Sequence, residues 1–329
     1  MDIVKVEDST SGEWDDMWKS CETSTYYHSR EWAEIWQSYS NGRIRPLPRT
    51  ITFSDGMKVV LPFSKQSYYG GLISRYSLSG ASIGSLPNYG NWLRNGTLTR
   101  GHISSLTEYL LNYNNLAWRL NPFDPSSKDV ETDKKYSQRK IFISYIINLT
   151  QGEDVVFARM DQNCRNKIKQ AKRNKLIVRE AENINDWKKY FEIYNDTLKR
   201  WGSKALYTLN WKFFELLTTV NPRDCKLWLT LYKNIPIAGS VCFYSHYKIL
   251  IWHSSSLTRY LPLRPVNLAR YEIIKNGIER GYHWIDFETA GGNKGLIKFK
   301  KSFGTDEIRS DRIITWHPVI HYTRKILGR

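Results

Sequence analysis

The sequence lacks several features that would assign it to a class at once. No apolar run approaches the roughly 20 residues of a membrane-spanning helix. The N-terminus, MDIVKVEDST, is acidic and has no apolar stretch like that of a signal peptide. The four cysteines, at positions 21, 164, 225 and 242, form no CxxC pair, so neither a disulfide framework nor a zinc site is predicted. We therefore expect a cytoplasmic protein with free, buried thiols.

Motifs for common cofactors are also missing. Neither GxGxxG nor GxxxxGK[ST] occurs, which argues against a dinucleotide-binding fold and a P-loop. His317 and His321 have the spacing of half a zinc pair, but Pro318 lies between them and no third ligand is evident. No bound metal or cofactor is expected.

Positive charge, by contrast, is abundant and unevenly divided. Residues 1–160 contain 18 Lys and Arg against 17 Asp and Glu, whereas residues 161–329 contain 31 against 15, a formal net charge of +16. The electrostatic field of so much positive charge favours a polyanionic partner, which could be nucleic acid, a pyrophosphate-bearing ligand or an anionic membrane surface. A merely soluble basic surface is the alternative.

Turn signals and hydrophobic periodicity predict an α/β organisation in two halves. Residues 122–140 are rich in Pro, Ser, Asp and Lys and read as a linker. Residues 50–63 form a predicted hairpin around Asp55-Gly56. The second half is predicted to contain strands at 140–149, 176–182, 227–246 (a hairpin), 249–256 and 283–289, and helices at 153–174, 183–201 and 263–282. A mixed sheet follows from this order.

Three groups of residues could carry chemistry. The helix at 153–174 presents a stripe of four cations, and a ligand anion would offset their repulsion unless the stripe is simply solvated. Cations also surround the start of the helix at 263–282, where the helix dipole favours phosphate. The strand WIDFE is expected to place Asp286 and Glu288 on one face. The cations of these groups are Arg165, Lys169, Lys172 and Arg173, and Arg259, Arg264 and Arg270.

The segment GGNKGLIKFKKSFG (291–304) combines glycines, lysines and phenylalanines after that strand. This segment is the last of four motifs that follow one another along the second half of the chain. Through these motifs and their order the chain resembles the Fem-type (FemAB- and FemX-like) transferases, the peptidoglycan interpeptide-bridge enzymes of the GNAT acyltransferase superfamily. In the first half, YYHSREWAEIW (26–36) and VVLPF (59–63) are similar to that family's N-terminal domain. The four motifs are RNKIKQAKRNKLIV (165–178), KRWG (199–202), NIPIAGSVCF (234–243) and the segment itself.

The resemblance implies two tandem GNAT-like domains, each a mixed, mostly antiparallel sheet flanked by helices. The expected domains are residues 1–139 and 140–315, with the tail 316–329 packed back on the first. The family's catalytically important lysine corresponds to Lys300, which would stabilise an oxyanion or ester oxygen. Asp286 is the second candidate catalytic residue. The candidate donor-binding residues are Arg165, Lys169, Lys172, Arg173, Arg259, Arg264, Asn267 and Lys298, and the candidate acceptor residues are Trp201, Trp252, Glu288 and Asn293.

Three functions follow from these expectations. The first is transfer of an aminoacyl group from aminoacyl-tRNA to an amine of a peptidoglycan precursor or similar acceptor. The second is acyl-CoA-dependent N-acylation of a sugar or small amine in cell-surface polysaccharide synthesis. The sequence TRYLPLRPVN (258–267) lacks the glycine-rich loop with which GNAT enzymes bind CoA, which favours tRNA. The third is a non-catalytic RNA- or membrane-binding protein, with peripheral association at the anionic inner membrane face.

Overall fold

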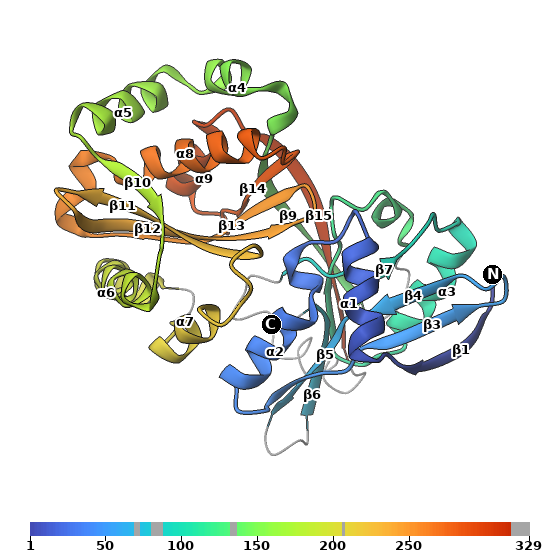
Figure 1. The fold of residues 1–329 in the computed structure, drawn as a ribbon. Coiled ribbons are helices and arrows are strands. Elements are labelled where there is room, and N and C mark those ends of the chain that lie inside the picture. Colours follow the sequence, from blue (N-terminus) through green and yellow to red (C-terminus); the bar gives the residue numbers. More distant parts are fainter. Residues whose placement is uncertain (69–72, 80–87, 132–136, 206–207, 317–329) are drawn as a thin grey trace, which may run out of the picture. The chain divides into compact units, whose positions relative to one another are not determined.

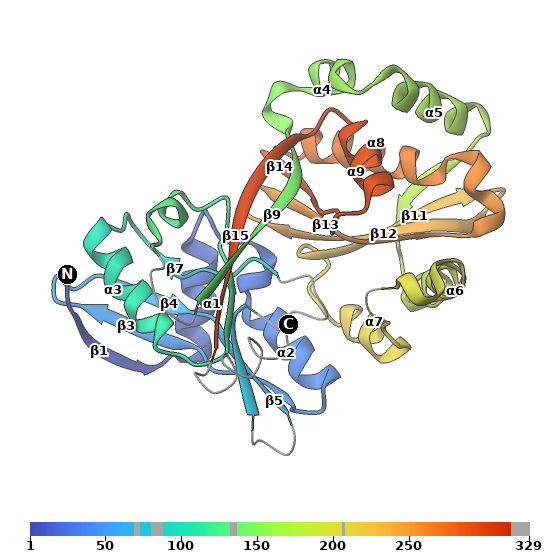
Figure 2. The ribbon, with the colours of Figure 1, turned by 180° about the vertical axis from the view of Figure 1, so that it is seen from behind.

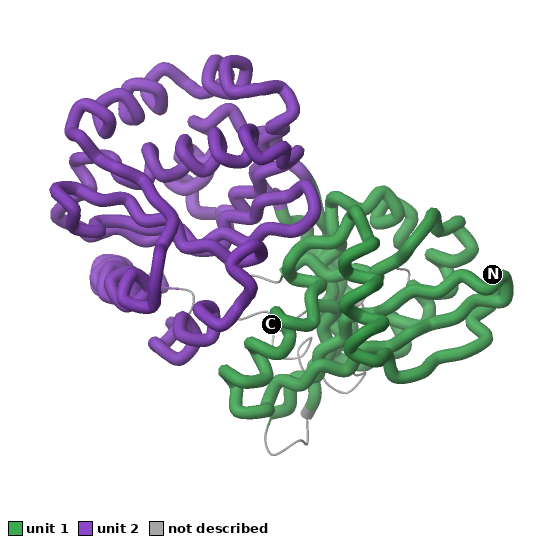
Figure 3. Tube along the Cα trace, viewed as in Figure 1, with its two compact units in different colours: residues 1–142, 309–329 green, residues 143–308 purple. Residues whose placement is uncertain are grey.

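The computed structural model describes residues 1–68, 73–79, 88–131, 137–205 and 208–316. It divides into two compact units (Figure 3). Unit 1 comprises residues 1–142 and the described residues from Arg309 on, and unit 2 comprises Ile143–Ile308. The predictions for the tail, including His317 and His321, lie outside the described residues.

Unit 1 contains two groups of strands with helices against them. The hairpin predicted around Asp55-Gly56 is confirmed: β3 and β4 pair antiparallel, and Gly56 takes a φ of +85° in the turn. One sheet has the order β1-β3-β4-β7, and the other strands of the unit follow the order β15-β8-β6-β5-β2. The elements are β1 (Ile3–Asp8), α1 (Ser11–Ser20), α2 (Arg30–Tyr39), β2 (Ile44–Pro46), β3 (Arg49–Phe53), β4 (Lys58–Leu61), β5 (Phe63–Tyr68), β6 (Ile73–Leu78), β7 (Leu93–Arg94), α3 (Arg100–Leu111), β8 (Leu116–Arg119) and β15 (Asp306–Thr315).

Unit 2 is built on a sheet with the order β10-β11-β12-β13-β14-β9. Its neighbouring strands are antiparallel except β13 and β14, which are parallel. The elements are β9 (Ser137–Asn148), α4 (Glu153–Arg159), α5 (Gln162–Arg173), β10 (Ile177–Glu180), α6 (Ile184–Trp201), α7 (Trp211–Leu217), β11 (Cys225–Tyr232), β12 (Ile235–Ser245), β13 (Lys248–Ser256), η6 (Thr258–Leu263), α8 (Pro265–Glu279), β14 (Trp284–Thr289) and α9 (Lys294–Lys301).

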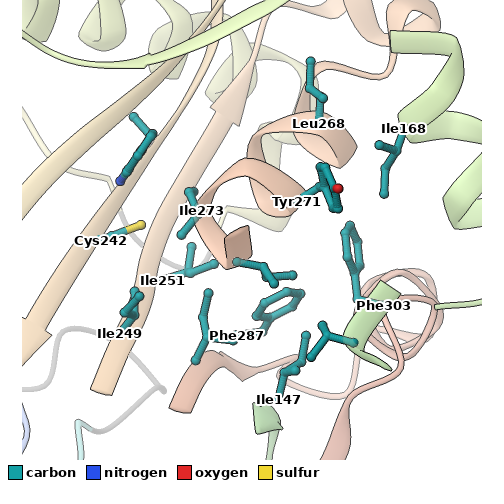
Figure 4. Packing of buried hydrophobic residues seen from close by; sticks show 14 of the residues in the cluster. Ile147, Ile168, Cys242, Ile249, Ile251, Leu268, Tyr271, Ile273, Phe287 and Phe303 are labelled. Carbon is teal, nitrogen blue, oxygen red and sulfur yellow. The ribbon is translucent and has the colours of Figure 1, made fainter. Parts of the chain in front are cut away.

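Helices cover both faces of the unit 2 sheet. Helices α4, α5, α8 and α9 lie on one face and α6 and α7 on the other, as the two opposite views show (Figures 1 and 2). The main core fills the space under α8, where Leu268, Tyr271 and Ile273 meet Ile249 and Phe287 of the strands (Figure 4). Glycine allows α6 to approach the sheet on the other face, because a Cβ on Gly239 would lie 2.5 Å from the Tyr190 ring. A mixed, mostly antiparallel α/β fold flanked by helices is thus confirmed.

Two local predictions need correction. The helix expected over 153–174 breaks after Arg159, because Asp161 caps a new helix by accepting a hydrogen bond from the Cys164 backbone N–H. The segment after β14 contains a helix, α9, that the sequence pattern did not predict, with Asn293 as its N-cap. The short length of α9 and its glycine hid the 3.6-residue period.

The burial of the cysteines and the character of the helices can be stated directly. All four cysteines are buried and free of disulfides. Among the helices that the structure describes, none has the length and apolar character to cross a membrane.

Candidate functional site

Strands β13 and β14 separate after a short parallel ladder. Lys248–Leu250 pairs with Trp284–Asp286, but β13 continues to Ser256 and β14 to Thr289 without further pairing between them. The backbone groups on the facing edges of these two half-strands are therefore left for other partners. This point of divergence in unit 2 is the candidate site.

A bulge in β13 arranges the side chains beside the divergence. Val241 pairs with His253 and Cys242 with Ile251, so Trp252 is an extra residue on β13. Such a bulge allows two consecutive residues to share a face. Trp252 packs on Phe213 with ring centroids 5.5 Å apart, and His253 packs on Phe214 at 5.9 Å. Both rings thus face α7, and the next residue, Ser254, turns to the α8 face.

On the α8 face, Arg270 meets both diverging strands. Its side chain is buried, its Nη2 donates to Ser254 Oγ at 2.9 Å, and its guanidinium carbon lies 5.2 Å from the Phe287 ring centroid. The Nε and Nη1 atoms are buried and have no hydrogen-bond partner among the described residues. Burial lowers the pKa of Arg270 to about 10, since it disfavours the charged form.

On the opposite face, His253 is buried beside Tyr190. The Tyr190 hydroxyl and His253 Nδ1 are hydrogen-bonded at 2.6 Å. Burial, and next the positive charge of Arg270, lower the pKa of His253 to about 3. The imidazole is therefore neutral at physiological pH and stabilises the packing of α6 on β13.

The end of β14 is shaped by Lys300. Its ammonium is buried and donates to the carbonyl oxygens of Phe287, Glu288 and Thr289. Successive carbonyls of a regular strand point in opposite directions, but Glu288 has a φ of +61°, which turns the chain so that all three converge. Three carbonyl acceptors use the three N–H groups of an ammonium. We predicted that Lys300 donates a hydrogen bond to an oxyanion. In this conformation its three N–H groups are already used by the three carbonyls.

The two carboxylates of WIDFE differ in their surroundings. Asp286 is buried, and its Oδ1 accepts a hydrogen bond from the Glu288 backbone N–H at 2.7 Å. Glu288 is only half-buried. The predicted alternation holds for Ile285 and Phe287, which both enter the core, but the strand register becomes irregular after Asp286. The expectation that Asp286 and Glu288 simply share one face is wrong, because the positive φ of Glu288 breaks the alternation.

The segment after β14 is held in place by its own side chains. Asn293, predicted to contact the acceptor, accepts a hydrogen bond from the Leu296 backbone N–H and so begins α9. Phenylalanines anchor the segment in the core, because Phe303 is fully buried and its ring packs edge-on against Phe299 and Phe287. Lys298 is exposed on α9.

The basic stripe on α5 is only partly open. Arg165 donates to the carbonyls of Ala158 and Met160 at the end of α4. Lys172 pairs with Glu272 of α8 at 3.2 Å, so an acidic residue of another helix offsets part of the charge of the stripe. Lys169 and Arg173 are exposed.

The start of α8 carries the other predicted cations. Arg264 is its N-cap at a φ of +62°, and its Nε is buried without a partner among the described residues. Arg259 is exposed and lies over the Tyr260 ring at 4.8 Å. Asn267 is buried, with its Nδ2 3.9 Å from Cys164 Sγ. Of the predicted acceptor residues, Trp201 is exposed at the end of α6.

Sequence reasoning missed the residues that meet at the divergence. His253 and Ser254 were not singled out, and Arg270 was assigned to the helix start, whereas it points into the sheet. The signal available was the run HSSS at the end of an apolar strand, since polar residues on a buried strand must find partners.

Comparisons with known proteins agree with this architecture. Residues 158–301 match a family model described as an acetyltransferase (GNAT) domain. FemX superposes with a TM-score of 0.66 at 14% identity, over 94% of this chain and 97% of FemX. L-PGS from Bacillus licheniformis gives 0.60 at 11%, over 98% of each chain. A conserved protein of unknown function from Bacteroides thetaiotaomicron gives 0.59 at 12%, over 96% of this chain and 100% of that one. No curated protein matches the sequence.

At such identities the solved structures establish a common fold, and the family model adds the type of domain. The match falls on unit 2, which contains the divergence of β13 and β14. The resemblance drawn from the sequence is confirmed in the fold: the chain has the fold of FemX, and its residues 158–301 match the family model of an acetyltransferase (GNAT) domain.

Proposed function

We propose that this protein is an aminoacyl transferase that moves an aminoacyl group from aminoacyl-tRNA to an amine of a peptidoglycan precursor or a similar acceptor. A GNAT domain supports transfer of an acyl group. The Fem-like fold over nearly the whole chain supports an aminoacyl donor and a cell-envelope acceptor.

The observation that carries the choice of donor is the charge of the second half. Residues 161–329 have 31 Lys and Arg against 15 Asp and Glu. Among the predicted donor-binding residues, exposed cations stand on three elements of unit 2, namely Lys169 and Arg173 on α5, Arg259 on η6 and Lys298 on α9. One pyrophosphate would need far fewer. A polyanion such as tRNA gains affinity from many such contacts, because each neutralised phosphate releases counterions.

The reaction places modest demands on the side chains. The acceptor amine attacks the ester carbonyl, the bond to the ribose oxygen breaks, and the proton lost by the amine balances the proton gained by that oxygen. Most of the rate enhancement then comes from positioning. Lys300 is a positioning residue, which holds the end of β14 through three carbonyls. Asp286 supports the same turn through the Glu288 N–H. Glu288, half-buried beside them, is the carboxylate that can hold the amine and accept its proton.

Equilibrium binding tests the donor. Bulk tRNA charged with labelled amino acids is compared with uncharged tRNA at two salt concentrations, with CoA as competitor. We expect charged tRNA to bind, CoA not to displace it, and affinity to fall by about tenfold or more between low and physiological salt. Tight CoA binding with weak, charge-independent tRNA binding would overturn the proposal.

That second result would favour the other candidate, an acyl-CoA-dependent N-acyltransferase acting on a sugar or small amine in cell-surface polysaccharide synthesis. The description of the matching family as an acetyltransferase is the observation in its favour. Its chemistry at the amine is the same, so Lys300 and Glu288 would have the same roles with either donor.

A further inference from the structure

Arg270 is a buried cation that the proposed chemistry does not use. Arg270 is 7% exposed, and the one hydrogen-bond partner of its side chain among the described residues is the Ser254 hydroxyl. Ser254 also donates to Ser240 Oγ at 2.9 Å, so this hydroxyl is not dedicated to the guanidinium. The Phe287 ring beneath supplies a cation–π contact at 5.2 Å but no acceptor atom.

The charge of Arg270 is not balanced within unit 2. No ion pair joins it to a described carboxylate, and the groups that act on it electrostatically are the Cys242 thiol and the Tyr190 phenol. Buried charges in proteins are ordinarily paired with an opposite charge, because desolvation without a partner is costly. Nε carries one N–H and Nη1 carries two, and these hydrogens have no acceptor in the part of the chain that the structure describes.

The guanidinium of Arg270 contacts both strands beyond the point where they diverge. Ser254 lies on β13 beyond the last residue that pairs with β14, and Phe287 lies on β14 beyond its last paired residue. Arg270 contacts both, so it stands beside the unpaired edges. A ligand group between the half-strands would meet backbone groups and a guanidinium together.

We propose that Arg270 forms a buried carboxylate-binding site where β13 and β14 diverge. Ser254 occupies one hydrogen of Nη2, which leaves one edge of the guanidinium with two parallel N–H groups for a carboxylate. A planar, singly charged group balances the charge of one guanidinium. A phosphate is bulkier and would bring a second charge into the same layer.

Under the proposed function, this site identifies the acceptor. The reacting carbonyl of an aminoacyl ester or of a thioester is not a carboxylate, so the carboxylate comes either from the amine-bearing substrate or from an acidic acyl group. Of these two sources we assign the amine-bearing substrate. The identity of that substrate rests on the proposed function, whereas the site itself rests on the geometry of Arg270.

Formate is the smallest carboxylate probe. The urea midpoint of the protein is measured across sodium formate concentrations, with sodium chloride at equal ionic strength as reference and inorganic phosphate as a second arm. The variants are Arg270→Met, Arg270→Lys and, as a control, Arg223→Met, which removes an exposed arginine from the same unit. The full chain is used throughout, and neither tRNA nor CoA is required.

We expect formate to raise the midpoint of the wild type and of Arg223→Met above the chloride value, and to leave Arg270→Met unchanged. Arg270→Lys should bind formate about tenfold more weakly, because an ammonium cannot offer two parallel N–H bonds. In chloride, Arg270→Met should be at least as stable as the wild type, since an unbalanced charge is removed.

Three results would overturn the proposal. These are equal midpoints of the wild type in formate and chloride, a formate effect that persists in Arg270→Met, and an effect of phosphate without one of formate. Should Arg270→Met not fold, an undiminished formate effect in Arg270→Lys would decide against the site in the same way. Failure here leaves the tRNA binding experiment unaffected, because that experiment reports on the donor.

Discussion

The Lys300 ammonium donates a hydrogen bond of 2.8 Å to the carbonyl oxygen of Glu288, a residue held at a φ of +61°. The lysine and the strained glutamate therefore form one structural feature at the end of β14. Carbonyls of the residues on either side, Phe287 and Thr289, bind the same ammonium. The lysine stabilises a turn that a non-glycine residue rarely adopts, and Glu288 occupies the positive-φ position of that turn.

Replacing Lys300 by methionine tests this structural role. The variant leaves three carbonyls without their donor, so we expect the free energy of unfolding to fall by about 3 kcal/mol, measured by urea denaturation. Lys298→Met, on the exposed side of the same helix, should leave stability nearly unchanged. A Lys300→Met protein with wild-type stability but no turnover would show instead that the ammonium acts on the substrate.

Replacing Glu288 by glycine separates the backbone strain at this residue from the role of its carboxylate in transfer. Glycine adopts positive φ without a steric penalty, so this variant should be about 1 kcal/mol more stable than the wild type, whereas Glu288→Gln should be close to it. If the carboxylate handles the amine, both variants lose turnover. Unfolding curves and single-turnover transfer, measured on the same preparations, distinguish the two effects. Full activity in Glu288→Gln would exclude the carboxylate from the reaction.

Features set by neighbouring residues could be predicted from the sequence. Asp55-Gly56 specifies a hairpin because glycine permits the turn wherever the chain goes next. The order of the strands from β9 to β14 and of the longer helices between them followed in the same way from periodicity and stop signals. Asp161 shows the limit: an aspartate side chain can cap a helix at many positions in a sequence, and only the folded structure shows that Asp161 begins a new helix here.

The site itself depends on contacts between distant residues. Arg270 meets Ser254 and Phe287, each 16 or 17 positions away in the sequence, because α8 crosses the sheet at that point. No local pattern gives such a crossing. For the same reason Lys300 was expected to be available to a ligand, although the fold brings three carbonyls to it.

The buried imidazole of His253 predicts an acid-sensitive stability. Its pKa is about 3 in the folded protein against an ordinary 6.5, so the unfolded chain binds the proton more readily and acid favours unfolding. The contribution of the neutral His253 imidazole to the free energy of unfolding is complete above pH 6.5 and declines as the pH falls toward 3. Between pH 7 and pH 5 it amounts to about 2 kcal/mol, from 1.36 kcal/mol per pH unit.

The measurement is urea unfolding of wild type and His253→Gln at pH 7 and pH 5. Glutamine can keep a hydrogen bond to Tyr190 but does not titrate, so the variant should lose about 2 kcal/mol less than the wild type on acidification. His283→Gln, which changes an exposed histidine, should behave as the wild type does. Parallel losses in wild type and His253→Gln would show that His253 is protonated in the folded protein.

The exposed cations of α5 can be tested through the salt dependence of tRNA binding. Removing both charges with Lys169→Gln and Arg173→Gln should lower the slope of log affinity against log salt by about one to two, since each lost phosphate contact removes nearly one released counterion. The matched control removes two exposed charges elsewhere in unit 2, with Lys188→Gln and Arg223→Gln. Lys188 lies on α6, across the sheet from α5, so the control keeps the net charge equal while sparing the α5 surface. A smaller slope in the α5 pair alone means that phosphates contact this helix. Equal slopes in the two double variants would mean that the net charge of the second half attracts tRNA and that α5 is not a defined binding site.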